Sequence, residues 1–114
     1  MTVLLFTTDL ACSSRVTGEG NARGVPVAVA MSAGALLEKS AGCRLVLLDL
    51  NSPGVDPSEL VPALSAHDPV PTIIAFAPHV HETKLQSATI AGCHQVLTRG
   101  QFHSQVGEIL QKYG

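Results

Sequence analysis

The sequence predicts an α/β fold in which helices cover both faces of a parallel sheet. The chain has 114 residues, of which 46% are hydrophobic and 14% charged, so it can bury one ordinary domain core. Only 4% are aromatic, and an interior built from aliphatic side chains suits buried parallel strands. Short aliphatic runs alternate with segments long enough to be the helical connections that parallel strands need. We therefore expect residues 1–114 to form one domain.

Three aliphatic runs in the first half of the chain are typical of strands. Residues 2–6 (TVLLF) form a continuous apolar run, as in a strand buried on both faces. Residues 25–31 form the second run, and Pro26 near its start cannot donate a sheet hydrogen bond, which favours an edge position. Residues 44–50 (RLVLLDL) give the clearest strand, and a lone acid, Asp49, lies at its end.

Between these strands the helical signals differ in strength. Residues 10–23 carry Gly18 and Gly20, each of which costs about 1 kcal/mol relative to Ala in a helix interior, so only a weak helix is expected there. Ser32 is a suitable cap for a short helix that continues through Lys39.

The second half of the chain continues the alternation. Asp56 to Glu59 resembles a capping box, which predicts a helix to about Ala66, although Pro62 predicts a kink or a late start. Strands are then expected at residues 72–77 and 95–98. A helix over residues 81–91 should end at Gly92, and a last amphipathic helix is predicted by Phe102, Val106, Ile109, Leu110 and Tyr113.

The three cysteines are too few and too far apart in sequence for a metal motif. Cys12, Cys43 and Cys93 are an odd number and show no Cys-x-x-Cys spacing, so reduced thiols are expected. Cys43 and Cys93 each follow Ala-Gly at a helix-to-strand turn. Those turns should lie at the sheet edge opposite Asp49, too far apart for a disulfide, with both thiols buried as core filler.

Charge and hydropathy disfavour two classes of partner. The net charge is −2 and the basic residues are scattered, so nothing points to nucleic acid. No signal-peptide pattern is present, and no apolar run approaches the roughly 20 residues that span a bilayer. We expect a cytoplasmic protein without a membrane partner.

Candidate functional residues follow the strands, because ligands of open α/β sheets bind outside the carboxyl ends of the strands. The residues at these positions are Thr7, Thr8, Asp9, Asp49, Asn51, Ala77, His79, Thr98 and Arg99.

The segment LVLLDLNSPGVDP resembles the phosphoacceptor segment of receiver domains in the response regulators of bacterial two-component signalling. PTIIAFAPH and AGCHQVLTRGQF resemble the fourth and fifth strands of that family. The resemblance covers nearly the whole chain, although the segment after the first strand carries little of it. It implies a CheY-like, flavodoxin-like α/β/α sandwich of three layers, a five-stranded parallel sheet in the order 2-1-3-4-5, and a phosphoacceptor at Asp49.

The sequence departs from the receiver pattern at several site positions. Receiver domains usually place two acids after the first strand, where this chain has Thr7 and Thr8, with Asp9 just beyond. The usual hydroxyl residue after the fourth strand is replaced by Ala77, and the aromatic on the fifth strand by Val96. Arg99 replaces a Lys.

These departures predict weak metal binding and inefficient phosphorylation. Mg²⁺ binds well where several carboxylates converge, and here only Asp9 and Asp49 could contribute. Without the metal, charge that develops on a transferred phosphoryl group loses its main electrostatic partner. We therefore expect no cofactor, or Mg²⁺ bound weakly at most. We also hypothesise a standing ion pair between Asp49 and Arg99.

Simpler roles are open for the same side chains. Asp49 could cap the turn after its strand through backbone N–H groups, and Asp9 is about as well placed to cap the next helix as to bind a metal. His79, His81 and Glu82 suggest a metal cluster, but a helix-start loop explains them better, because no ligand from another segment is identifiable.

The leading functional hypothesis is a stand-alone degenerate receiver, a pseudo-receiver that is not an enzyme and acts by binding another signalling protein. Its partner would be a histidine kinase or an effector, and the surface around the fourth and fifth strands and the last helix could also support a homodimer. One alternative is a working Mg²⁺-dependent phosphoacceptor that uses Asp49 with Asp9. Another is a flavodoxin-like small-molecule binder or enzyme, because a fold alone does not determine function.

Overall fold

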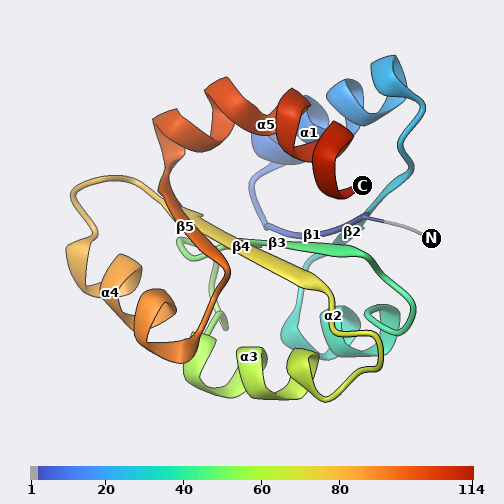
Figure 1. Ribbon diagram of the computed structural model, residues 1–114. Helices are drawn as coiled ribbons and strands as arrows, with labels where there is room; N and C mark the ends of the chain where they lie inside the picture. The colour runs from blue at the N-terminus through green and yellow to red at the C-terminus, as the bar shows by residue number, and fades with distance from the viewer. Residues whose placement is uncertain (1–2) are drawn as a thin grey trace.

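The structure is a computed structural model that describes residues 3–114, so Thr2, which we expected to begin the first strand, lies outside the described residues. Five parallel strands form one sheet in the order β2-β1-β3-β4-β5 (Figure 1). The strands are β1 (Val3–Phe6), β2 (Val27–Ala30), β3 (Leu45–Asp49), β4 (Thr72–Ala77) and β5 (Gln95–Thr98). The predicted fold class and the edge position of the Pro26 strand are confirmed.

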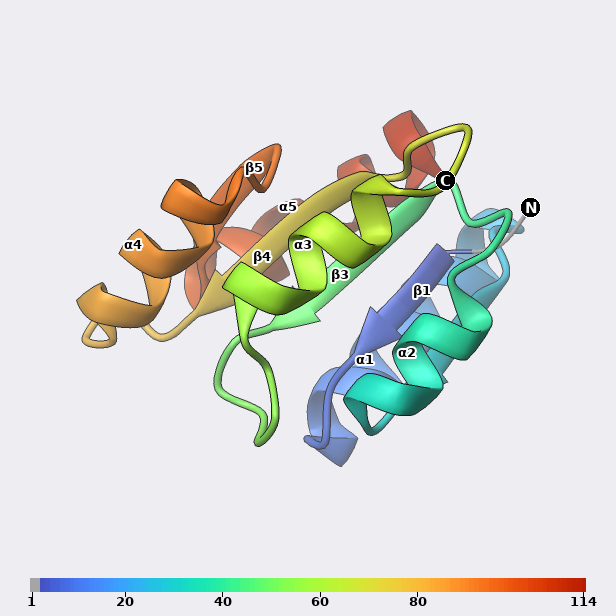
Figure 2. The same cartoon turned by 90° about the horizontal axis from the view of Figure 1, so that it is seen from below.

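Helices cover both faces of the sheet and make a three-layer sandwich. Figures 1 and 2 show helices on both faces of the sheet. The first face carries α1 (Leu10–Arg23) and α5 (Arg99–Tyr113), and the second carries α2 (Ala33–Lys39), α3 (Pro57–Ser65) and α4 (Glu82–Ala91). None of these helices is long and apolar enough to cross a membrane.

The sheet separates two hydrophobic cores, because successive side chains of a strand point to opposite faces. In β1, Leu4 and Phe6 belong to the core under α2, α3 and α4, whereas Val3 and Leu5 belong to the core under α1 and α5. All four side chains are buried. This is why β1 appears in the sequence as an unbroken apolar run.

The segment after β1 is a regular helix, contrary to the weak expectation. α1 runs without interruption through Gly18 and Gly20 and ends at Gly24, which has a left-handed φ of 69°. Gly20 is required by packing, because a Cβ atom there would lie 2.6 Å from the carbonyl oxygen of Val25 and 2.7 Å from a methyl group of Val27. The second glycine therefore lets α1 approach the loop that leads into β2.

The helix after β3 begins where its cap predicts. The Asp56 carboxylate accepts a hydrogen bond from the Ser58 backbone N–H, and Pro57 takes the first helical position. Of the two effects expected from Pro62, a kink or a late start, the late start is wrong, since the helix begins at Pro57 and includes Pro62 in its interior. The reciprocal capping box belongs to α5, in which the Thr98 hydroxyl and the Gln101 side chain each accept the other residue's backbone N–H.

The three cysteines are free thiols, as expected. Cys12 is buried in the core beneath α1 and α5, and Cys43 is buried in the core on the opposite face. Cys93 is half-buried against the same core as Cys43 rather than fully enclosed.

Candidate functional site

The sheet topology brings the ends of β1 and β3 together around Asp49. The two strands are direct neighbours, with Phe6 paired to Leu48, so Thr7 and Asp49 follow at adjacent positions. Asp49 is 2% exposed and Thr7 is fully buried. A carboxylate at this depth needs hydrogen-bond donors, because burying it without them is costly.

Three donors satisfy the Asp49 carboxylate. The Thr7 hydroxyl donates to Oδ2 over 2.8 Å, and the Ser52 hydroxyl donates to the same oxygen over 3.2 Å. The backbone N–H of Asn51 donates to Oδ1 over 3.1 Å. Asp49 therefore caps the turn after its strand, which was the simpler role considered for it, and it also joins β3 to the end of β1.

The two hydroxyl groups are themselves part of a closed network. Each hydroxyl has one proton, and in both cases that proton points to Asp49. The Thr7 oxygen accepts the backbone N–H of Asp9 over 3.0 Å, and the Ser52 oxygen accepts the backbone N–H of Thr8 over 2.9 Å. The Thr8 hydroxyl adds a longer contact to Ser52, at 3.3 Å.

Asp9 is the N-cap of α1. Its Oδ1 accepts backbone N–H groups from Ala11 over 2.9 Å and from Cys12 over 3.3 Å. This local role explains why an acid follows the two threonines.

The donor set around Asp49 does not fit a tightly held Mg²⁺ ion. A metal beside Asp49 would meet threonine hydroxyls that are already hydrogen-bonded to Asp49 and Ser52. Among residues 3–114 no group of three or more His, Cys, Asp or Glu side chains is arranged to hold a metal. The same finding covers His79, His81 and Glu82, of which His81 is the N-cap residue of α4 and makes no side-chain capping bond.

The hypothesised ion pair between Asp49 and Arg99 is wrong. Within the described part of the chain, the ion pair that forms is Arg23 with Glu19 on α1, and none joins Arg99 to Asp49. The physical reason is that both Asp49 oxygens already accept hydrogen bonds from other groups and the carboxylate is almost inaccessible.

The remaining predicted site residues have mixed placements. Asn51 contributes its backbone N–H, while its side-chain oxygen lies 3.5 Å from the Lys84 ammonium. Ala77 is buried and has no polar side-chain atom. Thr98 uses its hydroxyl to cap α5, so no contact places it in the Asp49 network.

Sequence reasoning missed Ser52 and His103, and it treated Cys12 as a reduced thiol without placing it near Asp49. Ser52 lies three residues after Asp49, and that short spacing in a turn could have marked it as a donor. Cys12 lies in the first turn of α1, where burial and the Asp49 charge raise the pKa of its thiol to about 11. Its proximity to Asp49 depends on how α1 packs on the sheet, and the sequence carries no direct signal for it.

Two solvent-open clefts flank the buried carboxylate at this edge. One, of about 630 Å³, lies between the β3–α3 loop and α4 and includes Asn51, Ser52 and Lys84 in its lining. The other, of about 420 Å³, lies between the starts of α1 and α5 and is lined by Asp9, Ala11, Cys12, Arg15, Arg99 and His103. Neither includes the Asp49 side chain in its lining.

Solved structures that resemble this chain include a chemotaxis response regulator and two receiver domains. The chemotaxis response regulator CheY4 of Vibrio cholerae is 19% identical with a TM-score of 0.81, over 99% of this chain and 98% of that one. The receiver domain of the sensor histidine kinase PA1611 from Pseudomonas aeruginosa PAO1, which has a magnesium ion in its active-site cleft, is 18% identical with a TM-score of 0.79, over 98% and 95%. The NtrX receiver domain from Brucella abortus is 18% identical with a TM-score of 0.76, over 97% and 96%.

These likenesses show that the chain has the CheY-like receiver fold. No protein-family model matches the sequence, and no curated protein matches it.

Proposed function

We propose that this chain is a degenerate receiver that acts in signal transduction by binding another protein. In this role residues 1–114 work as one receiver-like unit and catalyse no reaction of their own. The unit would act in the cytoplasm, where its partner would be a histidine kinase or an effector, with a homodimer as a second assembly.

The observation that carries the proposal is that the buried Asp49 carboxylate is fully engaged in hydrogen bonds within the protein. A phosphoacceptor must present a carboxylate oxygen to a phosphoryl donor and hold a divalent ion that neutralises the charge as it is transferred. In this chain the side chain is 2% exposed, and Oδ2 accepts two hydroxyl protons. Thr7 and Thr8 supply no carboxylate for the ion, and Oδ1 of Asp9 already accepts two backbone N–H groups at the start of α1.

Two residues on β4 and β5 also support a site that keeps one conformation. A switch needs contacts that differ between its two states. Ala77, at the end of β4, offers no hydroxyl that could bond a phosphoryl group, and Val96 on β5 has no ring that could reorient. The hydrogen bonds from Thr7 and Ser52 hold Asp49 in place without a phosphoryl group.

The test is to offer the protein a phosphoryl donor and a phosphoryl analogue in the presence of Mg²⁺. We expect no mass gain with acetyl phosphate by intact-mass spectrometry. With beryllofluoride we expect no new set of amide resonances for residues 49–52. A gain of one phosphoryl group that disappears in Asp49→Asn would overturn the proposal in favour of the working phosphoacceptor.

A variant that restores a second carboxylate tests whether its absence explains the expected lack of Mg²⁺ binding. Thr8 is exposed and occupies the position of a receiver acid, so Thr8→Asp adds a carboxylate beside the network at little packing cost. We expect Thr8→Asp to show saturable Mg²⁺-dependent shifts at residues 49–52, because the metal gains a second carboxylate. The matched control is Thr8→Asn, which has the same shape without the charge and should show none. Tight Mg²⁺ binding by the parent protein would contradict this explanation.

A further inference from the structure

The cleft between the starts of α1 and α5 is lined by positively charged side chains that have no role in the site described above. Figure 1 shows α1 and α5 side by side on one face of the sheet, and the cleft opens where both helices begin. Arg15 comes from the second turn of α1, while Arg99 is the first residue of α5 and His103 follows one turn later. Residues far apart in the sequence thus place two guanidinium groups and an imidazole around one solvent-open space of about 420 Å³.

Neither guanidinium in this cleft has a partner within residues 3–114. No ion pair or side-chain hydrogen bond is formed by Arg15 or Arg99, although Arg99 is half-buried. Arg23 on the same helix as Arg15 behaves differently, since it bonds Glu19 and Gln111. A guanidinium has five N–H donors, and those of a half-buried Arg99 gain most from an anion that enters the cleft.

His103 also lies in the positive field of this cleft. Burial lowers the pKa of its imidazole, and the charges of Arg15 and then Arg99 lower it further, while Asp9 and Asp49 act in the opposite direction with smaller effects. The ring Nδ1 is buried without a hydrogen-bond partner. The ring therefore lies beside two guanidinium groups whose effect exceeds the opposing effect of Asp9 and Asp49.

Asp9 is the one carboxylate in the lining and opposes an incoming anion. Its Oδ1 already accepts two backbone N–H groups at the start of α1, which partly satisfies its charge. Two guanidinium groups outnumber it, and neither is held by an ion pair or side-chain hydrogen bond within residues 3–114. The balance favours a compact anion of two negative charges over a carboxylate of one.

We propose that this cleft is a binding site for a small tetrahedral dianion of the phosphate class, held between Arg15 and Arg99 with His103 beside it. The planar guanidinium fork matches two oxygens of such a group, which a single ammonium cannot do. Inorganic phosphate and the terminal group of a phosphate monoester share this chemistry. The site does not require Asp49 to accept a phosphoryl group, so it stands apart from the function proposed above.

The test is an NMR titration with sulfate, inorganic phosphate and glycerol phosphate at a constant ionic strength set with sodium chloride. Sulfate keeps its two charges throughout the pH range of histidine titration, so its binding can be followed without ligand protonation. We expect saturable shifts confined to residues 9–15 and 99–103. Arg15→Gln and Arg99→Gln should each weaken binding about tenfold, because each removes a charge-assisted hydrogen-bonding group.

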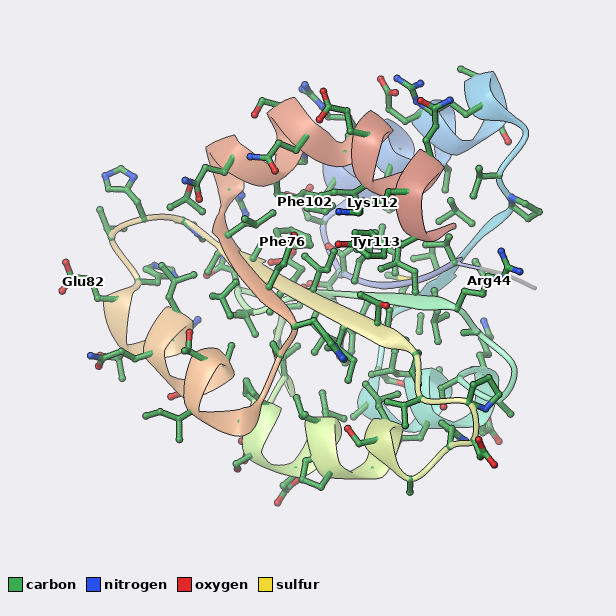
Figure 3. All side chains as sticks on the ribbon, in the orientation of Figure 1. Arg44, Phe76, Glu82, Phe102, Lys112 and Tyr113 are labelled. Carbon is green, nitrogen blue, oxygen red and sulfur yellow. The ribbon has the colours of Figure 1, made fainter. Side chains whose placement is uncertain are left out.

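The matched control is Arg44→Gln. Arg44 lies at the opposite edge of the molecule (Figure 3), and its replacement removes the same charge without touching the cleft. It should leave the affinity for sulfate within about twofold, because exposed charges at that distance are screened by salt. Equal weakening by all three variants would show only a general charge effect and would overturn the proposal.

His103 supplies a second readout. A bound dianion offsets the charges of Arg15 and Arg99, so it must raise the pKa of His103 in the parent protein, and sulfate affinity must increase as the pH falls through the titration of that ring. Shifts that stay linear in sulfate, or an unchanged His103 titration at saturating sulfate, would overturn the site. Tighter binding of glycerol phosphate than of inorganic phosphate would assign the site to monoesters, and the reverse order would assign it to the free ion.

Discussion

At the residue scale, the buried carboxylate of Asp49 works as a structural junction. Its donors come from the end of β1 and from the turn after β3, so its hydrogen bonds connect segments 42 residues apart in sequence. A hydrogen bond to a charged group contributes about 1.5–3 kcal/mol, whereas a buried carboxylate that loses a donor retains its desolvation cost. The threonine at position 7 is therefore as important to this junction as the aspartate itself.

Replacing Thr7 by Val tests that junction. Valine keeps the shape of the side chain but removes the donor to Asp49 and the acceptor of the Asp9 N–H. We expect the free energy of unfolding to fall by about 2 kcal/mol, measured by urea denaturation. Thr8→Val is the control, because its exposed hydroxyl makes only a 3.3 Å contact with Ser52, and it should change stability by less than about 0.5 kcal/mol. Equal midpoints for the two variants would argue against the junction.

At the scale of elements, α1 shows how packing overrides local propensity. Two glycines lower its intrinsic helicity, yet it forms 14 residues of helix because Val16 and Cys12 bury against the sheet and Asp9 caps its start. The two glycines are not equivalent. Gly18 has open space around its Cα, whereas Gly20 is in contact with the loop before β2.

Alanine substitutions at the two glycines should have opposite effects. Gly18→Ala should raise the free energy of unfolding by about 0.5–1 kcal/mol, since alanine has the higher helix propensity and meets no neighbour. Gly20→Ala should lower it by about 1–3 kcal/mol, because the new methyl group would overlap the Val25 carbonyl and force the backbone to move. Thermal denaturation of both variants checks the signs. Stabilisation by Gly20→Ala would mean that α1 does not approach β2 as described.

At the scale of the whole molecule, one sheet couples two cores. The central strands β1 and β3 are buried on both faces, so neither core can lose its packing without exposing the other. On the α5 side the rings of Phe76 and Phe102 stack with centroids 3.9 Å apart and tie β4 to the last helix, as Figure 3 shows. This arrangement favours unfolding in a single cooperative step.

The cysteines offer a measurement of that cooperativity. Cys12 and Cys43 lie in opposite cores, and burial raises the pKa of both thiols, so the folded protein should react slowly with a thiol reagent. We expect pulsed alkylation in increasing urea, read by peptide mass spectrometry, to give the same midpoint at both positions. Cys93 is half-buried and serves as an internal comparison. Separate midpoints for Cys12 and Cys43 would show that the two faces unfold independently.

Strands and helix caps were predictable because they depend on residues that are close together in sequence. The strands at 72–77 and 95–98 follow from aliphatic composition and flanking turn residues, and the caps at Ser32 and Asp56 bond backbone groups two or three residues away. The strand order required the resemblance to receiver domains, because the segments themselves do not state which strands are neighbours.

The sequence by itself determined a parallel sheet with helical connections, with Asp49 at the end of one strand and Thr7, Thr8 and Asp9 after another. Only the tertiary structure decided which of these side chains bond one another. The Asp49 partners are Thr7 and Ser52 rather than Arg99, and Arg99 instead faces a cleft with Arg15 and His103. Hydrogen bonds across 42 residues depend on strand register, helix packing and depth of burial, and these are set by all the contacts of the fold together.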